Sequence, residues 1–178
     1  MNRYTLILTF LLSLVSLPSL GVGFEDLVKR EGLFYKKFTN VPYSGKVTWR
    51  NDEDPEVYRT QPSSSAVGRV IHASLKRGKW DGEWLEYDDL GQLVTEGTYR
   101  NGKREGEWVD YYFDTGKVRG KETYKNGKRE GKYLRYWSNG QLTTDGTYKN
   151  GKAEGEWVYY NHETGQELIK VRYKNGKR

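Results

Sequence analysis

Two histidines and a recurring pair of carboxylates are the side chains in this sequence that could support acid–base catalysis. His72 lies in a predicted strand and His162 beside a predicted turn, and no serine stands in the pattern of a nucleophile elbow. Glu105 and Glu107 are spaced as paired carboxylates, but such carboxylates recur along the chain beside Lys and Arg. Equivalent carboxylates stand at Glu83, Glu154 and Glu156. This pattern is typical of cross-strand charge pairs on a solvated surface, so we predict no catalytic residues and no enzyme activity.

The remaining motifs that carry chemistry are weak or missing. The phrase NGKREG has the glycines of a phosphate-binding loop, but it lacks the Gly-Lys-Ser/Thr ending and no helix is predicted after it. The chain has 178 residues and no cysteine, which excludes disulfides, thiol nucleophiles and thiolate metal sites. The sequence therefore predicts neither a metal site nor a cofactor.

The composition indicates an ordered chain with a polar surface. Charged residues make up 30% of the sequence and aromatic residues 15%, and disordered chains are poor in aromatics. The formal net charge is +6, but Lys and Arg are mixed with Asp and Glu throughout. We therefore predict no nucleic-acid partner.

One sequence motif is repeated several times along the chain. The phrase YKNGKREGKYLRYWSNGQL, from Tyr124 to Leu142, has close relatives that start at Tyr99 and Tyr148. Its glycines recur every 24 or 25 residues, at Gly78, Gly102, Gly127, Gly151 and Gly176. A fixed period in this range is the signature of a repeat architecture.

Each period contains two turns and two strands. The four Asn-Gly pairs that begin at Asn101, Asn126, Asn150 and Asn175 are strong signals for two-residue hairpin turns. The second turn, which reads DDLGQ, FDTGK, WSNGQ or HETGQ, is one residue longer in alternate repeats and explains the 24/25 alternation. Strand-like runs rich in Tyr, Trp, Val and Thr lie between the turns. We predict an all-β fold, a single-layer antiparallel meander of tandem β-hairpin repeats.

Alternation along the strands predicts an aromatic row on one face of this ribbon. The row consists of Trp84, Trp108, Tyr133 and Trp157. An aliphatic row on the opposite face consists of Leu85, Val109, Leu134 and Val158, and a column of small residues beside the aromatic row consists of Gly82, Gly106, Gly131 and Gly155. We expect these glycines to leave room for the rings to lie against the backbone. Because a single layer leaves one face partly open, the aromatic row is a candidate exposed surface for a protein partner, although its rings could instead pack on one another.

Basic residues cluster at the Asn-Gly turns and predict a positively charged edge. The candidates for anion binding are Lys79, Arg100, Lys103, Arg104, Lys125, Lys128, Arg129, Lys149 and Lys152. The opposite turns carry Asp88, Asp89, Asp114 and Glu163, with Lys117 as an exception. Such a basic edge could bind anionic lipid or an anionic envelope polymer, or could simply keep the turns soluble.

The repeated unit Y-[KR]-N-G-K-x-E-G-[EK]-[WY]-x-x-Y, followed by G-[QK]-[LV], resembles the MORN-repeat variant of bacteria. Many proteins with this repeat carry the label of a YwqK-type antitoxin. The resemblance covers residues 75–178, as four full units and a truncated fifth, and REGLFYKKFTNVPYSGKV at 30–47 is similar to the start of exported members. It implies a twisted hairpin ribbon that serves as a scaffold or adaptor, in some members with lipid binding.

The N-terminal third differs from the repeats. Residues 1–23 combine a basic start, a short apolar run from Tyr4 to Leu17 and small residues at Gly21 and Gly23, which predicts a signal peptide that is cleaved after Gly23. An uncleaved membrane anchor is the alternative. Residues 24–74 predict a degenerate repeat, with Gly45 in the place of Gly82 and a loop over 50–67 that is rich in Pro, Ser and acidic residues.

These features together predict an exported protein, periplasmic or secreted, that binds other molecules. Our first hypothesis is a non-enzymatic scaffold that holds a protein partner with the aromatic row. The alternatives are a binder of membrane surfaces or envelope polymers, and an antitoxin or immunity protein, which the family label implies. The sequence leaves the partner and the oligomeric state open.

Overall fold

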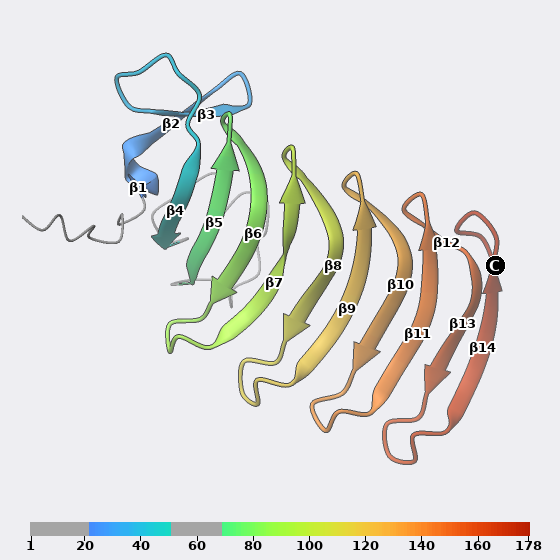
Figure 1. Ribbon diagram of the computed structural model, residues 1–178. Helices are drawn as coiled ribbons and strands as arrows, with labels where there is room; N and C mark the ends of the chain where they lie inside the picture. Colours follow the sequence, from blue (N-terminus) through green and yellow to red (C-terminus); the bar gives the residue numbers. More distant parts are fainter. Residues whose placement is uncertain (1–21, 51–68) are drawn as a thin grey trace, which may run out of the picture.

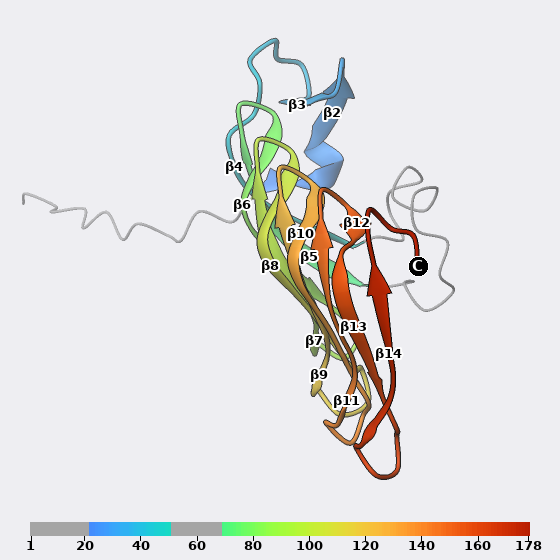
Figure 2. The same cartoon turned by 90° about the vertical axis from the view of Figure 1, so that its right-hand side faces the viewer.

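The computed structural model of the chain describes residues 22–50 and 69–178. These residues form a twisted, curved ribbon of strands in one layer, with a small hairpin folded over one end (Figure 1, Figure 2). Within the two described ranges, the helical element is a single 3-10 turn, η1 (Phe24–Asp26). The predicted all-β meander of antiparallel hairpins is confirmed.

The strands of the ribbon follow one another in chain order, each antiparallel to the next. They are β4 (Gly45–Arg50), β5 (Val70–Lys76), β6 (Lys79–Tyr87), β7 (Leu93–Arg100), β8 (Lys103–Tyr111), β9 (Val118–Lys125), β10 (Lys128–Tyr136), β11 (Leu142–Lys149), β12 (Lys152–Ala153), β13 (Gly155–Tyr160) and β14 (Glu167–Tyr173). Strands β12 and β13 both pair with β11, on either side of Glu154. The exception to antiparallel order is β1 (Val22–Gly23), which pairs with β4 in parallel.

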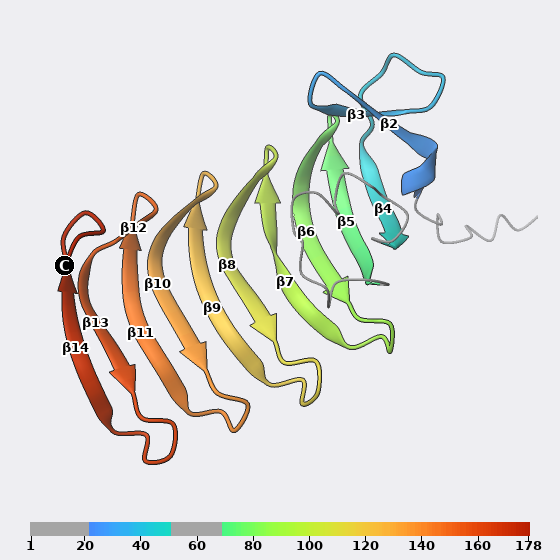
Figure 3. The same ribbon diagram turned by 180° about the vertical axis from the view of Figure 1, so that it is seen from behind.

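Two kinds of turn lie at opposite edges of the ribbon (Figure 3). At the NG-turn edge, Asn101, Asn126, Asn150 and Asn175 have φ values of 50°, 52°, 51° and 52°. These are the left-handed values that a type I′ hairpin turn requires, so the turn prediction is confirmed. At the long-turn edge, five-residue turns at 88–92 and 137–141 alternate with six-residue turns at 112–117 and 161–166. This alternation confirms the predicted cause of the 24/25 spacing.

A second sheet covers the N-terminal end of one face. It consists of β2 (Leu27–Arg30) and β3 (Leu33–Lys36), and it is fastened to the turn between β5 and β6 because Phe34 N–H donates to Gly78 O (2.8 Å) and Gly78 N–H donates to Tyr43 O (2.7 Å). An apolar cluster lies between this second sheet and the ribbon. Its buried members are Leu27, Phe34, Val47, Trp49, Ile71, Ala73 and Leu75.

The segment predicted to be a degenerate repeat pairs in the same register as the regular hairpins. Val47 pairs with Ala73 across β4 and β5, just as Trp84 pairs with Gly97 across β6 and β7. Val47 is 1% exposed, so a small side chain fills this position where the N-terminal segment already covers the face.

Two predictions fall largely outside the described residues. The predicted signal peptide lies there except for Val22 and Gly23, which form β1, and the predicted loop 50–67 lies there except for Arg50, the last residue of β4. In the part of the chain that is described, no helix has the length and apolar character needed to cross a membrane.

Candidate partner-binding surface

One face of the ribbon, here called the aromatic face, carries two interleaved rows of rings. The predicted row of Trp84, Trp108, Tyr133 and Trp157 lies beside a second row of Tyr99, Tyr124, Tyr148 and Tyr173. Ring centroids are 5.1 Å apart for Tyr99–Trp108 and 5.1 Å apart for Tyr148–Trp157, both edge to face. This is the preferred geometry of aromatic pairs, so each ring stabilises its neighbours across repeats.

The predicted exposed stripe is wrong for two of its four members. Trp108 is 4% and Trp157 is 6% exposed, whereas Trp84 and Tyr133 are half-buried. The indole N–H of Trp108 donates to Thr98 O and that of Trp157 donates to Thr147 O, each at 3.2 Å. These bonds hold the indoles flat on the preceding strand, where tyrosines of neighbouring strands cover them.

The glycines that accommodate the rings are not those predicted. A Cβ atom at Gly97 would collide with the ring of Trp108, and one at Gly146 with the ring of Trp157. By contrast, Gly106 has φ of 71° and a Cβ there would meet nothing within 4 Å. Gly106 lies where the register of β8 against β7 shifts, as glycine does in a β-bulge. The glycines of the predicted small column therefore allow the backbone conformation of the bulge. A different set, Gly97 and Gly146, leaves the space that the tryptophan rings occupy.

One repeat departs from this packing. Glu122 pairs with both Trp108 and Tyr133, the position that Gly97 and Gly146 hold in the neighbouring repeats. Tyr133 replaces the tryptophan there. Gly120 replaces Thr95 and Thr144 of the equivalent strands, and a Cβ at Gly120 would collide with the guanidinium of Arg135. Several neighbouring positions have therefore changed together to admit a charged cluster.

Glu122 is the centre of that cluster. Its carboxylate accepts hydrogen bonds from Tyr124 Oη (2.7 Å) and Arg129 Nε (2.7 Å), and forms a close ion pair with Arg135. Asp110 Oδ2 lies 3.6 Å from Arg135 Nη1. Burial raises the pKa of Glu122, but these hydrogen bonds and the two arginine charges outweigh it and hold the pKa below its usual value. The cluster is thus ionised and fixed in place.

Two residues predicted for the basic edge lie on the aromatic face instead. The guanidinium of Arg104 is 4.1 Å from the ring centroid of Trp108 and donates to Tyr124 Oη at 3.3 Å, while Arg129 is bound to Glu122. Side chains alternate along a strand, so position 104 shares the face of position 108. The other predicted members of the edge are exposed: Lys79, Arg100, Lys103, Lys125, Lys128, Lys149 and Lys152.

The recurring carboxylates divide into two roles, of which only one was predicted. Glu107 Oε1 pairs with Lys121 Nζ across strands at 3.2 Å, as expected for a solvated charge pair. Glu105, however, accepts a hydrogen bond from the backbone N–H of Asn126 at 2.8 Å. Equivalent bonds run from Asn101 to Asp81, from Asn150 to Glu130 and from Asn175 to Glu154. Each acid therefore fixes the NG turn of the next repeat.

The two histidines have structural contacts. His72 Nδ1 lies 2.8 Å from Thr48 Oγ1, and the ring of His162 packs edge to face on Trp137 at 5.1 Å. On the opposite face of the ribbon, Tyr111 Oη donates to Glu96 at 2.6 Å. Among residues 22–50 and 69–178, no group of three His, Asp or Glu side chains is arranged to hold a metal ion.

Three segments of the chain match the family model of the MORN repeat variant. They are residues 80–101, 104–126 and 129–150, which form strands β6 to β11. A comparison with curated proteins finds no match. The family is a class of non-enzymatic repeats that commonly serve as scaffolds and binding modules. The meander of consecutive antiparallel hairpins over these three segments is consistent with MORN repeats.

Proposed function

We propose that the protein is a non-enzymatic scaffold or adaptor that binds a protein partner through its aromatic face. The observation that carries this proposal is a strip of half-buried tyrosine and arginine side chains between β7 and β11, over the buried tryptophans. Its members are Tyr99, Arg104, Tyr124, Arg129 and Tyr148.

The chemistry of this strip suits protein recognition. Tyr, Trp and Arg are the residue types that contribute most to binding at protein interfaces. Arg104 is held between Trp108 and Tyr124, and Arg129 by Glu122, so neither side chain must lose much conformational freedom on binding. In this arrangement the row of Trp84, Trp108, Tyr133 and Trp157 supports the strip from below, and the side chains of the strip contact the partner.

Adjacent residues allow a matched test of the surface. Arg104 lies on the aromatic face and Lys103 on the NG-turn edge, so Arg104→Gln and Lys103→Gln remove the same charge from different surfaces. We expect the full chain to capture a defined protein from envelope extract at high salt, and Arg104→Gln but not Lys103→Gln to weaken that capture. Equal capture by both variants would refute the proposal.

The NG-turn edge is a second candidate, for anionic lipid headgroups or an anionic envelope polymer. Two of its lysines begin close to the turn of the next repeat: a Cβ at Gly127 would lie 3.4 Å from Lys103 Cβ, and one at Gly176 would lie 3.6 Å from Lys152 Cβ. These two lysines therefore begin beside the next NG turn, and equivalent backbone positions of successive repeats lie about 10 Å apart. Binding to anionic vesicles that weakens with salt and in the double variant Lys103→Gln/Lys128→Gln would support this function. Binding that the double variant retains in full would exclude it.

We also propose that the protein is exported by a signal peptide over residues 1–23. N-terminal sequencing of the protein from the envelope fraction tests this proposal. A start at Phe24 is the expected result. A start at Val22 would retain β1 and refute the predicted cleavage site, and an intact N-terminus would favour the membrane anchor.

A further inference from the structure

Three successive turns of the long-turn edge each expose a large apolar side chain. Leu90, Phe113 and Trp137 are 80%, 69% and 40% exposed. They are the large apolar residues that are exposed between β6 and β11, and each lies in a different turn. Single exposed apolar residues are ordinary, but one in each of three successive turns along one edge is a recurring pattern.

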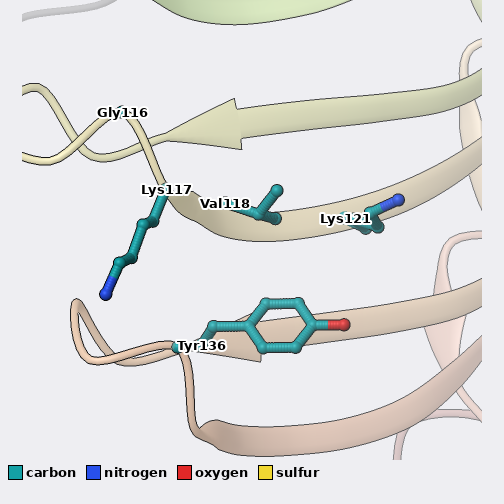
Figure 4. Close-up of a pocket in the computed structure, with 6 residues that line it drawn as sticks. Gly116, Lys117, Val118, Lys121 and Tyr136 are labelled. Atoms are coloured by element: carbon teal, nitrogen blue, oxygen red, sulfur yellow. The ribbon is translucent and has the colours of Figure 1, made fainter.

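A hollow lies between the second and third of these turns. Its volume is about 440 Å³, and its lining residues are Gly116, Lys117, Val118, Lys121, Tyr136 and Gly140. Figure 4 shows Lys117 reaching toward the turn that follows Tyr136, beside the ring of Tyr136 and the side chain of Val118. The apolar walls of this hollow can receive an apolar side chain of another molecule.

The charge of this edge is the reverse of that at the NG turns. The four long turns contain Asp88, Asp89, Asp114 and Glu163 against one lysine, Lys117. The Asp88 carboxylate accepts hydrogen bonds from the backbone N–H groups of Leu90 and Gln92. Asp89, Asp114 and Glu163, by contrast, are exposed. A partner that covers this edge is therefore expected to be basic, and an anionic membrane is disfavoured.

The spacing of the turns matches an α-helix. Successive repeats lie two strand spacings apart, about 9.6 Å. Residues seven positions apart on one helix face are separated by about 10.5 Å. Over three turns the mismatch reaches only about 2 Å, which side chains can absorb.

We infer that the long-turn edge is a second docking surface, separate from the aromatic face, for a basic amphipathic helix of a partner protein. Apolar side chains of that helix, repeating every seven residues, pack against Leu90, Phe113 and Trp137, and one enters the hollow beside Tyr136. Its lysine or arginine side chains face Asp89, Asp114 and Glu163.

The test uses the full chain and a labelled synthetic helix of about three heptads, with leucines every seven residues on an alanine and lysine background. Fluorescence anisotropy measures binding of this peptide and of a control peptide with the same composition and scrambled leucine positions. We expect Phe113→Ser/Trp137→Ser to weaken binding at least about tenfold, because two buried apolar contacts are lost.

The matched control is Phe38→Ser/Val41→Ser, which removes two side chains that are 101% and 73% exposed elsewhere on the molecule. This control and Arg104→Gln should leave the affinity unchanged, so failure here is distinguishable from failure of the aromatic-face proposal. Absence of binding, equal binding of the scrambled peptide, or full binding by Phe113→Ser/Trp137→Ser would overturn the inference. Binding to neutral lipid vesicles that the same variant abolishes, without peptide binding, would assign the edge to a membrane instead.

Discussion

Replacing Glu122 with glutamine tests whether the charged cluster on the aromatic face stabilises the sheet. The Glu122 side chain is 8% exposed and is bound by Tyr124, Arg129 and Arg135. Glu122→Gln keeps the shape but leaves two guanidinium groups beside a neutral amide. Removing one partner of a buried ion pair costs about 3–5 kcal/mol. Because the side chains of Arg129 and Arg135 are 41% and 26% exposed, water compensates in part, and we expect a loss of about 2–3 kcal/mol.

Urea unfolding, followed by both tryptophan fluorescence and circular dichroism, measures this loss. Two probes are needed because repeat arrays can unfold in parts. Glu107→Gln is the matched control, since Glu107 is 56% exposed and pairs with Lys121 on the opposite face. That control should change the unfolding free energy by less than about 0.5 kcal/mol. If Glu122→Gln costs no more than Glu107→Gln, the reasoning about the buried cluster is refuted.

The pH dependence gives the same prediction a second readout. The folded state lowers the pKa of Glu122 below its usual value of 4.5, so the folded chain releases this proton more readily than the unfolded chain. The stabilisation is therefore present above pH 4.5 and is lost as pH falls through the lowered pKa. The unfolding free energies of the native chain and Glu122→Gln should converge in acid. A difference that stays constant as the pH falls would contradict the assignment.

Three further changes probe other parts of the ribbon. Gly146→Val should cost about 2–4 kcal/mol in urea unfolding, because even a Cβ at this position collides with the indole above it; a loss below about 0.5 kcal/mol would contradict the packing. Glu130→Gln should weaken the bond from Asn150 N–H (2.6 Å) by about 1 kcal/mol and speed amide exchange at that turn, whereas unchanged exchange would argue against the turn-fixing role. Burial and the hydrogen bond to Glu96 raise the pKa of Tyr111 to about 12 from 10, so the unfolding free energy should fall as pH rises between these values. Thermal unfolding measured over this pH range should show a smaller fall for Tyr111→Phe.

Turn chemistry was the part of the fold that could be predicted most fully. The Asn-Gly pairs demand left-handed backbone whatever surrounds them, so Asn126 and its equivalents report their geometry locally. The extra residue in alternate long turns was likewise visible in the spacing of Gly91, Gly116 and Gly140. Both signals depend on a few adjacent residues and need no knowledge of packing.

The surface of the aromatic face could be predicted only in part. The alternation of side chains along the strand predicted the face of Trp108 correctly, and the same rule places Arg104 on that face. We assigned Arg104 to the basic edge instead, because of its charge. Which glycine accommodates a ring depends on the bulge at Gly106, and sequence spacing alone does not distinguish a bulge glycine from one under a ring such as Gly97. The burial of Trp108 follows from these contacts across strands and not from its own repeat.

The role of Glu122 was not predicted, although an alignment of the repeats marks its position as different. It stands where Gly97 and Gly146 stand, next to a tyrosine that replaces tryptophan. The exposed Phe113 and Trp137 were missed for the opposite reason: they lie inside turns, where no periodicity marks a side chain as buried or exposed.

Hydroxyl-radical labelling of tyrosines, with and without the captured partner, shows which face of the ribbon the partner covers. Both faces carry tyrosines, so the molecule supplies its own control: Tyr99, Tyr124 and Tyr148 lie on the aromatic face, and Tyr111 and Tyr136 on the opposite face. A partner held by the aromatic face should protect the first three and leave the other two unchanged. Protection of Tyr111 and Tyr136 alone, or of neither set, would contradict binding through the aromatic face.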